Sequence, residues 1–325
     1  MFKRMKGIDT IVKNCMEVRP GQNILIVTDD YARSIKISQQ VAEACDSEGA
    51  EVVMAIMAAR THQGQEPPRS IAEAMQVVDI IFQVSDSFSI LHTNAGKSAR
   101  DKGIKYVSAA SRLGEDYFNR EISVDDLNRI KERTERLAEI MSSADEARFT
   151  SGYGNEIRMS LKDRKGIAIH PLNRTGIITV PDYAEAAVAP VEGSTEGILV
   201  VDGWIRNWNF TFREPLQLTV KSGKVVEVSG PEDYVGRLKD LLAMDEQSSN
   251  CAAELGIGTS HTMLKEVVWG QRSGPGLAGT AHIAVGRNND IGGKTLSQIH
   301  YDLIVTKPTV WLDDLCVLEN GELKI

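Results

Sequence analysis

The chain lacks several features that would fix its class directly. Only four of its 325 residues are cysteines, and no two form a C-x-x-C pair, so neither a disulfide framework nor a zinc ribbon is predicted. The formal net charge is -8, with no basic block interleaved with aromatic residues, which argues against nucleic acid or an anionic membrane surface as a partner. No apolar run approaches the roughly 18 residues of a membrane span, and no signal peptide opens the chain. We therefore expect a cytoplasmic protein that acts on a small molecule.

Common nucleotide-binding and hydrolase signatures are missing as well. The sequence has no Walker A motif, no nucleophile elbow and no zincin H-E-x-x-H. Residues 274–279 (GPGLAG) match G-x-G-x-x-G, but they contain a proline and precede a strand-like run instead of opening a helix. A dinucleotide site needs the order strand, turn, helix, so we do not expect one here.

The first 145 residues alternate strand-like and helix-like stretches. Residues 23–28 form a short apolar run after Pro20 and Gly21, which is typical of a buried parallel strand. Strands separated by helical patterns predict a parallel sheet with right-handed crossovers, so residues 1–145 should form an α/β, Rossmann-like domain. The expected strands are 23–28, 51–57, 78–84 and 104–109, and the expected helices are 34–48, 70–76, 93–102 and 124–143.

Short strand-like runs dominate after residue 150. Residues 221–224 (KSGK) predict a hairpin turn between two alternating strands. This pattern favours an α+β, mainly antiparallel domain over residues 146–325. The expected strands are 166–169, 176–180, 197–201 and 216–220, and the expected helix is 231–244.

The sharpest chemical feature is the segment His300-Tyr301-Asp302. Residues i and i+2 of a strand project from the same face, so this histidine and this aspartate point the same way. Apolar Ile299 and Leu303 flank them on the opposite face. An imidazole beside a carboxylate is two-thirds of a 2-His-1-carboxylate facial triad, which leaves three metal positions open. A His–Asp hydrogen bond within a sheet is the structural alternative.

A third metal ligand has to come from a separate segment. Glu254 lies among small and apolar neighbours, where a lone carboxylate is costly unless something compensates it. His261 follows a glycine-rich stretch, and His282 lies inside a glycine-bounded apolar strand. Each of these alone could be a satisfied polar residue of the core. Together with His300 and Asp302 they predict a metal cluster in the second domain.

Three segments together resemble the aminopeptidase T family of metalloproteases in motif, order and rough spacing: 253–258 (AELGIG), 279–286 (GTAHIAVG) and 299–302 (IHYD). Residues 181–193 resemble the family's earlier acidic motif, and the likeness runs from about Asn23 to the C-terminus. Carried over by motif, the resemblance implies a site for two metal ions. Its ligands would be Glu185, Glu254, His282, His300 and Asp302.

Two departures separate the chain from the peptidase pattern. The acidic-and-lysine stretch expected before 279–286 is replaced by 271–276, which has no acid, and Asn289 stands where a tyrosine is expected. The same superfamily includes 2,5-dihydroxypyridine 5,6-dioxygenase, a mononuclear Fe(II) enzyme that opens a pyridine ring. His261 stands where peptidase relatives have Asn-Pro, and by this resemblance it would complete a facial triad with His300 and Asp302. The dioxygenase has a histidine in place of Glu185, which implies a different base or substrate.

We therefore expect an extradiol-type Fe(II) dioxygenase that cleaves a small hydroxylated aromatic ring or N-heterocycle with O2. Glu185 would act as general base, His92 and His282 would orient the substrate or the oxygen, and Glu254 would be a metal ligand or fix a ligand imidazole. The alternative is a dinuclear aminopeptidase or amidohydrolase with two Zn(II), Co(II) or Mn(II) ions. A non-enzymatic metal-binding protein is a third interpretation. The resemblance also implies a homodimer or a larger homo-oligomer.

Overall fold

The computed structural model describes residues 4–87, 89–110, 115–174, 177–181, 183–205, 208, 213–263 and 275–325. The chain divides into two compact units. The first comprises Met1–Lys131 and Ile169–Tyr183, and the second comprises Glu132–Ala168 and Ala184–Ile325. The expected domain boundary near residue 145 stays a prediction.

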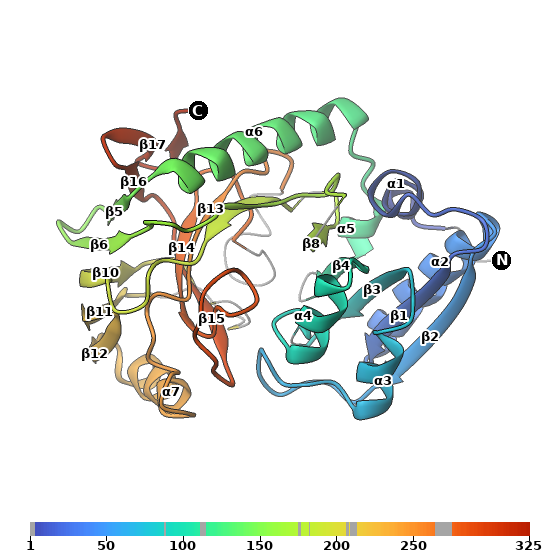
Figure 1. The fold of residues 1–325 in the computed structure, drawn as a ribbon, viewed down its shortest axis with the longest axis horizontal. Helices are drawn as coiled ribbons and strands as arrows, with labels where there is room; N and C mark the ends of the chain where they lie inside the picture. The colour runs from blue at the N-terminus through green and yellow to red at the C-terminus, as the bar shows by residue number, and fades with distance from the viewer. Residues whose placement is uncertain are drawn as a thin grey trace. The chain divides into compact units, whose positions relative to one another are not determined.

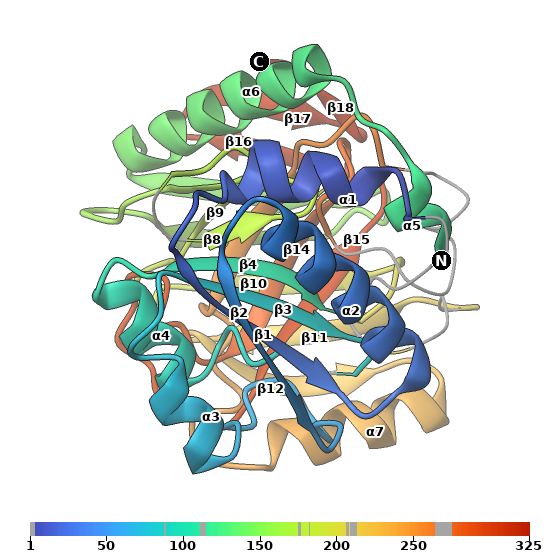
Figure 2. The same ribbon diagram turned by 90° about the vertical axis from the view of Figure 1, so that its right-hand side faces the viewer.

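The first unit is built on a parallel sheet. Its strands follow the order β2 (Glu51–Met57), β1 (Asn23–Asp29), β3 (Ile80–Ser85), β4 (Lys105–Ala110) and β8 (Ile177–Thr179). Helix α2 (Ala32–Ser47) crosses one face of this sheet (Figure 2). It buries Ile37, Val41 and Ala44 at helical spacing, and these side chains join the core of the sheet.

The second unit contains two sheets (Figure 1). Every pair of neighbours in the larger sheet is antiparallel, as are the pairs from β15 to β9 in the smaller one. The larger sheet has the order β12 (Lys224–Ser229), β11 (Leu216–Lys221), β10 (Glu196–Val201), β6 (Glu156–Ser160), β5 (Glu146–Thr150), β16 (Thr309–Leu312), β17 (Leu315–Glu319) and β18 (Glu322–Leu323). The smaller sheet has the order β15 (His300–Val305), β14 (Ala281–Gly286), β13 (Glu254–Gly258), β9 (Glu185–Val188) and β7 (Ile167–Ile169).

Every predicted helix is present within two residues of its expected ends, and three further short helices before residue 120 were not predicted. Helix α6 spans the predicted residues Val124–Ser143, and the turn at 221–224 joins β11 and β12 as a hairpin. No helix among the described residues is long and apolar enough to cross a membrane. The remaining helices are α1 (Gly7–Thr10), the π-helix η1 (Ile11–Met16), α3 (Arg69–Ala74), α4 (Asn94–Asp101), α5 (Glu115–Asn119) and α7 (Glu232–Leu242).

A mixed α/β fold with a parallel sheet first and antiparallel sheets later is confirmed, with one correction. We expected the strand at 176–180 among the antiparallel strands of the second half. Instead β8 pairs in parallel with β4, with Ile177 opposite Tyr106. Both Ile177 and Ile178 are buried, and such an uninterrupted apolar run suits a parallel sheet covered on both faces better than a half-exposed antiparallel strand.

Candidate metal centre

The register of the smaller sheet in the second unit gathers five polar side chains on one face. Residues that lie directly opposite each other on neighbouring antiparallel strands point to the same side. Ala284 lies between Glu254 and Asp302, and Gly256 lies opposite His282. Side chains alternate between the two faces along each strand, so all the candidate ligands except His261 project from this face. These residues are Glu185, Glu254, His282, His300 and Asp302.

Small residues make room for these side chains. A Cβ atom on Gly256 would lie 2.0 Å from Cε1 of His282, so the imidazole occupies the space that a side chain at position 256 would fill. Gly286 lies opposite His300 and has a φ of +99°, a conformation that favours glycine. Ala284 separates the carboxylates on either side of it. The glycines and the alanine thus form the floor of the site.

The opposite face of the same strands is apolar. Leu255, Ile283 and Leu303 form one row across β13, β14 and β15, and all three are fully buried. Ile257 and Val305 belong to the next row and are also buried. The sheet is therefore anchored in the core by one face and displays its polar groups on the other.

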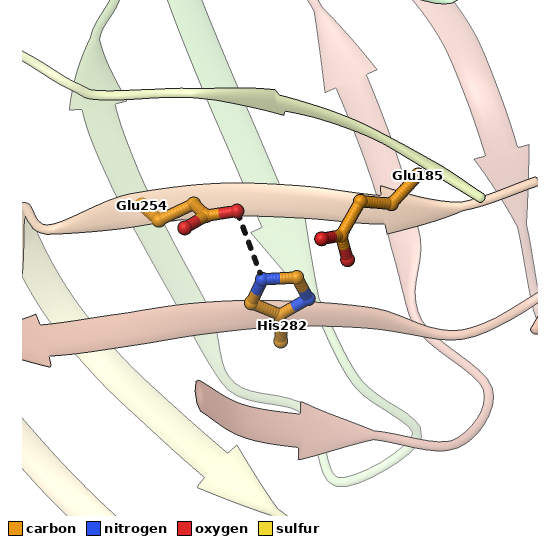
Figure 3. A group of neighbouring side chains, drawn as sticks. All are labelled: Glu185, Glu254 and His282. Atoms are coloured by element: carbon orange, nitrogen blue, oxygen red, sulfur yellow. Dashed lines mark hydrogen bonds and ion pairs between the residues drawn. The ribbon is translucent and has the colours of Figure 1, made fainter. Parts of the chain in front are cut away.

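Glu254 lies at the centre of the cluster. Its Oε1 is 3.4 Å from Nε2 of His282, and its Oε2 is 3.2 Å from Nε2 of His300. Nε2 of His300 is also 3.2 Å from Oδ1 of Asp302. Figure 3 shows the ring of His282 between the carboxylates of Glu254 and Glu185. All five side chains are at most 5% exposed.

These contacts define two groups of potential ligands that share Glu254. One consists of Glu185, Glu254 and His282, and the other of Glu254, His300 and Asp302; within each group the candidate ligand atoms lie within 4.8 Å of one another. Imidazole nitrogens and carboxylate oxygens without a thiolate suit Fe(II), Zn(II), Co(II) and Mn(II). Nδ1 of His282 is buried and has no hydrogen-bond partner among the described residues. The donor set therefore fits a divalent first-row metal.

The electrostatics of the cluster also favour a cation. Burial disfavours the charged form of His300, but Asp302 and Glu254 overcome that effect and raise its pKa well above the ordinary value. The pKa of His282 is raised as well, because Asp302, Glu254 and Glu185 outweigh its burial. Burial would raise the pKa of Glu254, yet its hydrogen bonds to the two histidines lower it. Protons on the imidazoles thus balance the carboxylates, and a metal ion would compete for the same positions.

A backbone carbonyl fixes the orientation of His300. Nδ1 of this ring lies 2.8 Å from the carbonyl oxygen of Arg287. A carbonyl only accepts hydrogen bonds, so Nδ1 carries a hydrogen and donates it. Nε2 is thereby directed at Glu254 and Asp302, as in metal sites whose ligand imidazoles are held by a backbone acceptor.

The structure does not bring His261 into either ligand group. This histidine follows β13 at the edge of the described residues and its side chain is exposed, whereas His300 and Asp302 are buried together. Residues 271–274 of the acid-free stretch 271–276 lie outside the described residues. A triad of His261, His300 and Asp302 therefore stays a prediction.

His92 lies in the first unit and is buried. It directly precedes Thr93, the N-cap of α4, whose Oγ1 accepts a hydrogen bond from the N–H of Gly96 at 3.1 Å. The expected place at the start of a helix agrees with this position. Its role toward a substrate stays a prediction.

Sequence reasoning missed the loop between β14 and β15. Asn289 entered only as a replacement for tyrosine; in the structure its Oδ1 accepts hydrogen bonds from the guanidinium of Arg287 at 3.0 and 3.2 Å. The adjacent Asn288 is fully buried. The signal available in the sequence was the polar, glycine-containing segment 287–293 directly after a ligand-bearing strand.

The fold and the cluster together define the class: an α/β protein with a buried, metal-ligand type site on an antiparallel sheet. The model of the 2,5-dihydroxypyridine 5,6-dioxygenase family matches residues 8–325, and the chain belongs to this family. The expected superfamily is thereby confirmed.

Two solved structures share the fold. A 2,5-dihydroxypyridine dioxygenase from Pseudomonas putida KT2440 aligns with a TM-score of 0.79 at 17% identity, covering 98% of this chain and 96% of that one. Wild-type AmpT from Thermus thermophilus aligns with a TM-score of 0.69 at 15% identity, covering 99% and 98%. No curated protein sequence matches the chain significantly.

Proposed function

We propose that this chain is a metal-dependent dioxygenase that opens the ring of a small hydroxylated aromatic or N-heterocycle similar to 2,5-dihydroxypyridine. The observation that carries the proposal is the family match over residues 8–325. One Fe(II) ion would be held by His300, Asp302 and Glu254, which form one of the two ligand groups. His261 would be a further ligand by the family resemblance alone. A homo-oligomeric state and a cytoplasmic location stay predictions.

The residues around the proposed metal have distinct tasks. Bound Fe(II) would supply the open positions at which a ring hydroxyl and O2 meet. Glu185 would accept a proton from a ring hydroxyl at its carboxylate, which makes the ring more electron-rich. His282 lies between Glu185 and Glu254 and would orient the substrate by a hydrogen bond. Burial of the five groups keeps bulk water from the site.

A second candidate function rests on one feature of the cluster. Glu254 belongs to both ligand groups, and each group offers one imidazole and two carboxylates. Because Glu254 is shared, the two groups support the aminopeptidase alternative, in which Glu185, Glu254 and His282 would hold one ion and Glu254, His300 and Asp302 the other. Two Zn(II), Co(II) or Mn(II) ions would supply an activated water for attack on an amide carbonyl.

Metal content and product distinguish the two functions. The protein is purified without oxygen and reconstituted separately with Fe(II), Zn(II), Co(II) and Mn(II), and bound metal is counted. Oxygen uptake is followed with 2,5-dihydroxypyridine and with catechols, and amine release is followed with leucyl amides. The dioxygenase proposal expects one iron per chain and oxygen uptake that E185Q abolishes. Amine release with two metals per chain and no oxygen uptake would establish the hydrolase instead.

A further inference from the structure

The loop between β14 and β15 contains a buried side chain that the proposed chemistry does not use. Nδ2 of Asn288 donates to the carbonyl of Ala252 at 2.9 Å and to Oε1 of Glu192 at 3.2 Å. Its Oδ1 accepts from the N–H of Thr295 at 2.8 Å. Ala252 lies just before β13, and Glu192 lies just after β9. One amide therefore connects the loop to the segments that flank two strands with candidate ligands.

The peptide unit between Arg287 and Asn288 is held at both ends. The N–H of Asn288 donates to the carbonyl of Thr295 at 3.1 Å, and the carbonyl of Arg287 accepts from Nδ1 of His300 at 2.8 Å. A peptide unit is planar, so a rotation that releases the N–H also swings the carbonyl away from the imidazole. The anchored side chain of Asn288 thus determines where the acceptor for His300 lies.

We propose that Asn288 is a positioning residue that sets the ring orientation and the tautomer of His300 through the carbonyl of Arg287. The hydrogen on Nδ1 leaves Nε2 as the nitrogen that faces Glu254 and Asp302. The inference rests on the metal site of the proposed function. Loss of a partner that orients a ligand imidazole lowers metal affinity by roughly 10–100-fold.

Gly293 offers an independent way to disturb the same amide. A Cβ atom on Gly293 would lie 2.1 Å from Cγ of Asn288. The backbone of Gly293 is outside the left-handed region, so an alanine there causes a steric clash without backbone strain. The variant G293A therefore displaces the amide while every polar group stays in the chain.

Matched controls exist elsewhere in the second unit. Asn155 is also buried, and its Nδ2 donates to the carbonyl of Ile198 at 3.0 Å. A Cβ atom on Gly152 would meet nothing within 4 Å, and this glycine has no positive φ. N155A and G152A thus match the two test variants in chemistry without touching the loop.

The test uses the full chain loaded with Zn(II), which gives sharp NMR signals, and labelled with ¹⁵N-histidine. Ring ¹⁵N shifts report which nitrogen carries hydrogen, H300N assigns the signal, and chelator competition gives Zn(II) affinity. We expect an Nδ1–H, metal-bound Nε2 pattern for His300 in the wild type and both controls. N288A and G293A should lose this single pattern and bind Zn(II) roughly 10–100-fold more weakly.

Each outcome decides the question. Unchanged ring shifts and affinity in folded N288A or G293A would overturn the positioning role, and so would an equal loss in N155A. If N288A does not fold, G293A decides alone. A wild-type chain whose His300 ring does not bind Zn(II) would refute the metal site itself. Neither readout depends on dioxygenase or hydrolase turnover, so the two failures are distinguishable.

Discussion

Replacing Gly256 by alanine would put a methyl carbon in the place of an imidazole. The new Cβ would lie 2.0 Å from Cε1, 2.4 Å from Nε2 and 2.8 Å from Nδ1 of His282. An ordinary carbon contact begins near 3.4 Å, so the ring has to move by roughly 1.4 Å. A shift of that size changes the position of Nε2 relative to Oε1 of Glu254, which now lies 3.4 Å away.

Two effects of G256A follow from this clash. Overpacking of a tight site costs about 1–3 kcal/mol in the free energy of unfolding. Displacement of a candidate ligand should weaken Zn(II) binding by roughly 10–100-fold. Urea denaturation in the presence of a chelator measures the first effect on the metal-free protein, and chelator competition measures the second. G152A, whose added Cβ meets nothing within 4 Å, serves as the control for both.

A double-mutant cycle makes the cause testable. In H282A the ring is gone, so alanine at position 256 has room and should gain roughly 0.5–1 kcal/mol over glycine from lower backbone entropy. G256A should therefore destabilise the wild type and be neutral or stabilising in H282A. An equal loss in both backgrounds would refute the argument, because the cost would then come from something other than the ring.

Three further outcomes are expected. Zn(II) should bind more tightly as the pH rises from about 6 to 8, because the raised pKa values of His282 and His300 mean that metal must displace protons; pH-independent affinity by calorimetry would contradict this. Burial and two nearby cationic side chains lower the pKa of His170 to about 4. The contribution of this residue to the free energy of unfolding is therefore fully present above pH 6.5, roughly its pKa in the unfolded chain, and it decreases by on the order of 3 kcal/mol as the pH falls toward 4. H170Q should flatten that slope, and an unchanged slope would exclude His170 as its source. Native alkylation should modify Cys316 first, since the other three thiols are buried with pKa values raised to about 12; early labelling of a buried thiol, seen by mass spectrometry, would contradict that order.

Much of the fold could be predicted because periodicity is a local property. The parallel strands and α6 follow from short apolar runs and from a helical repeat in the sequence. The exception, β8, is a three-residue strand whose partner β4 lies about 70 residues earlier in the chain. The local sequence of such a short strand does not indicate which strand it pairs with, so only the folded structure assigns it to the first unit.

Local sequence patterns likewise predict some residues of the candidate site and miss others. The pair His300 and Asp302 follows from the two-residue period of a strand, and the structure brings Glu254 beside it. His261 lies outside any regular strand, so its spacing along the chain predicts nothing about its direction. Asn288 was missed because its importance comes from hydrogen bonds to residues that are far apart in the sequence.

The pairing of strands in the smaller sheet contains a pattern that a sequence alone could reveal. Along the polar face β13 reads Glu-Gly-Gly, β14 reads His-Ala-Gly and β15 reads His-Asp-Ile. In the observed register each candidate ligand lies opposite a glycine or an alanine, and no two ligands of neighbouring strands are paired directly. A shift of one residue in the register of a strand would place its apolar side chains on the face that carries the ligands. A shift of two residues between β13 and β14 would place Glu254 directly opposite His282, with no small residue opposite either of them. The small residues therefore specify the register, and the register in turn determines which side chains can share a metal ion.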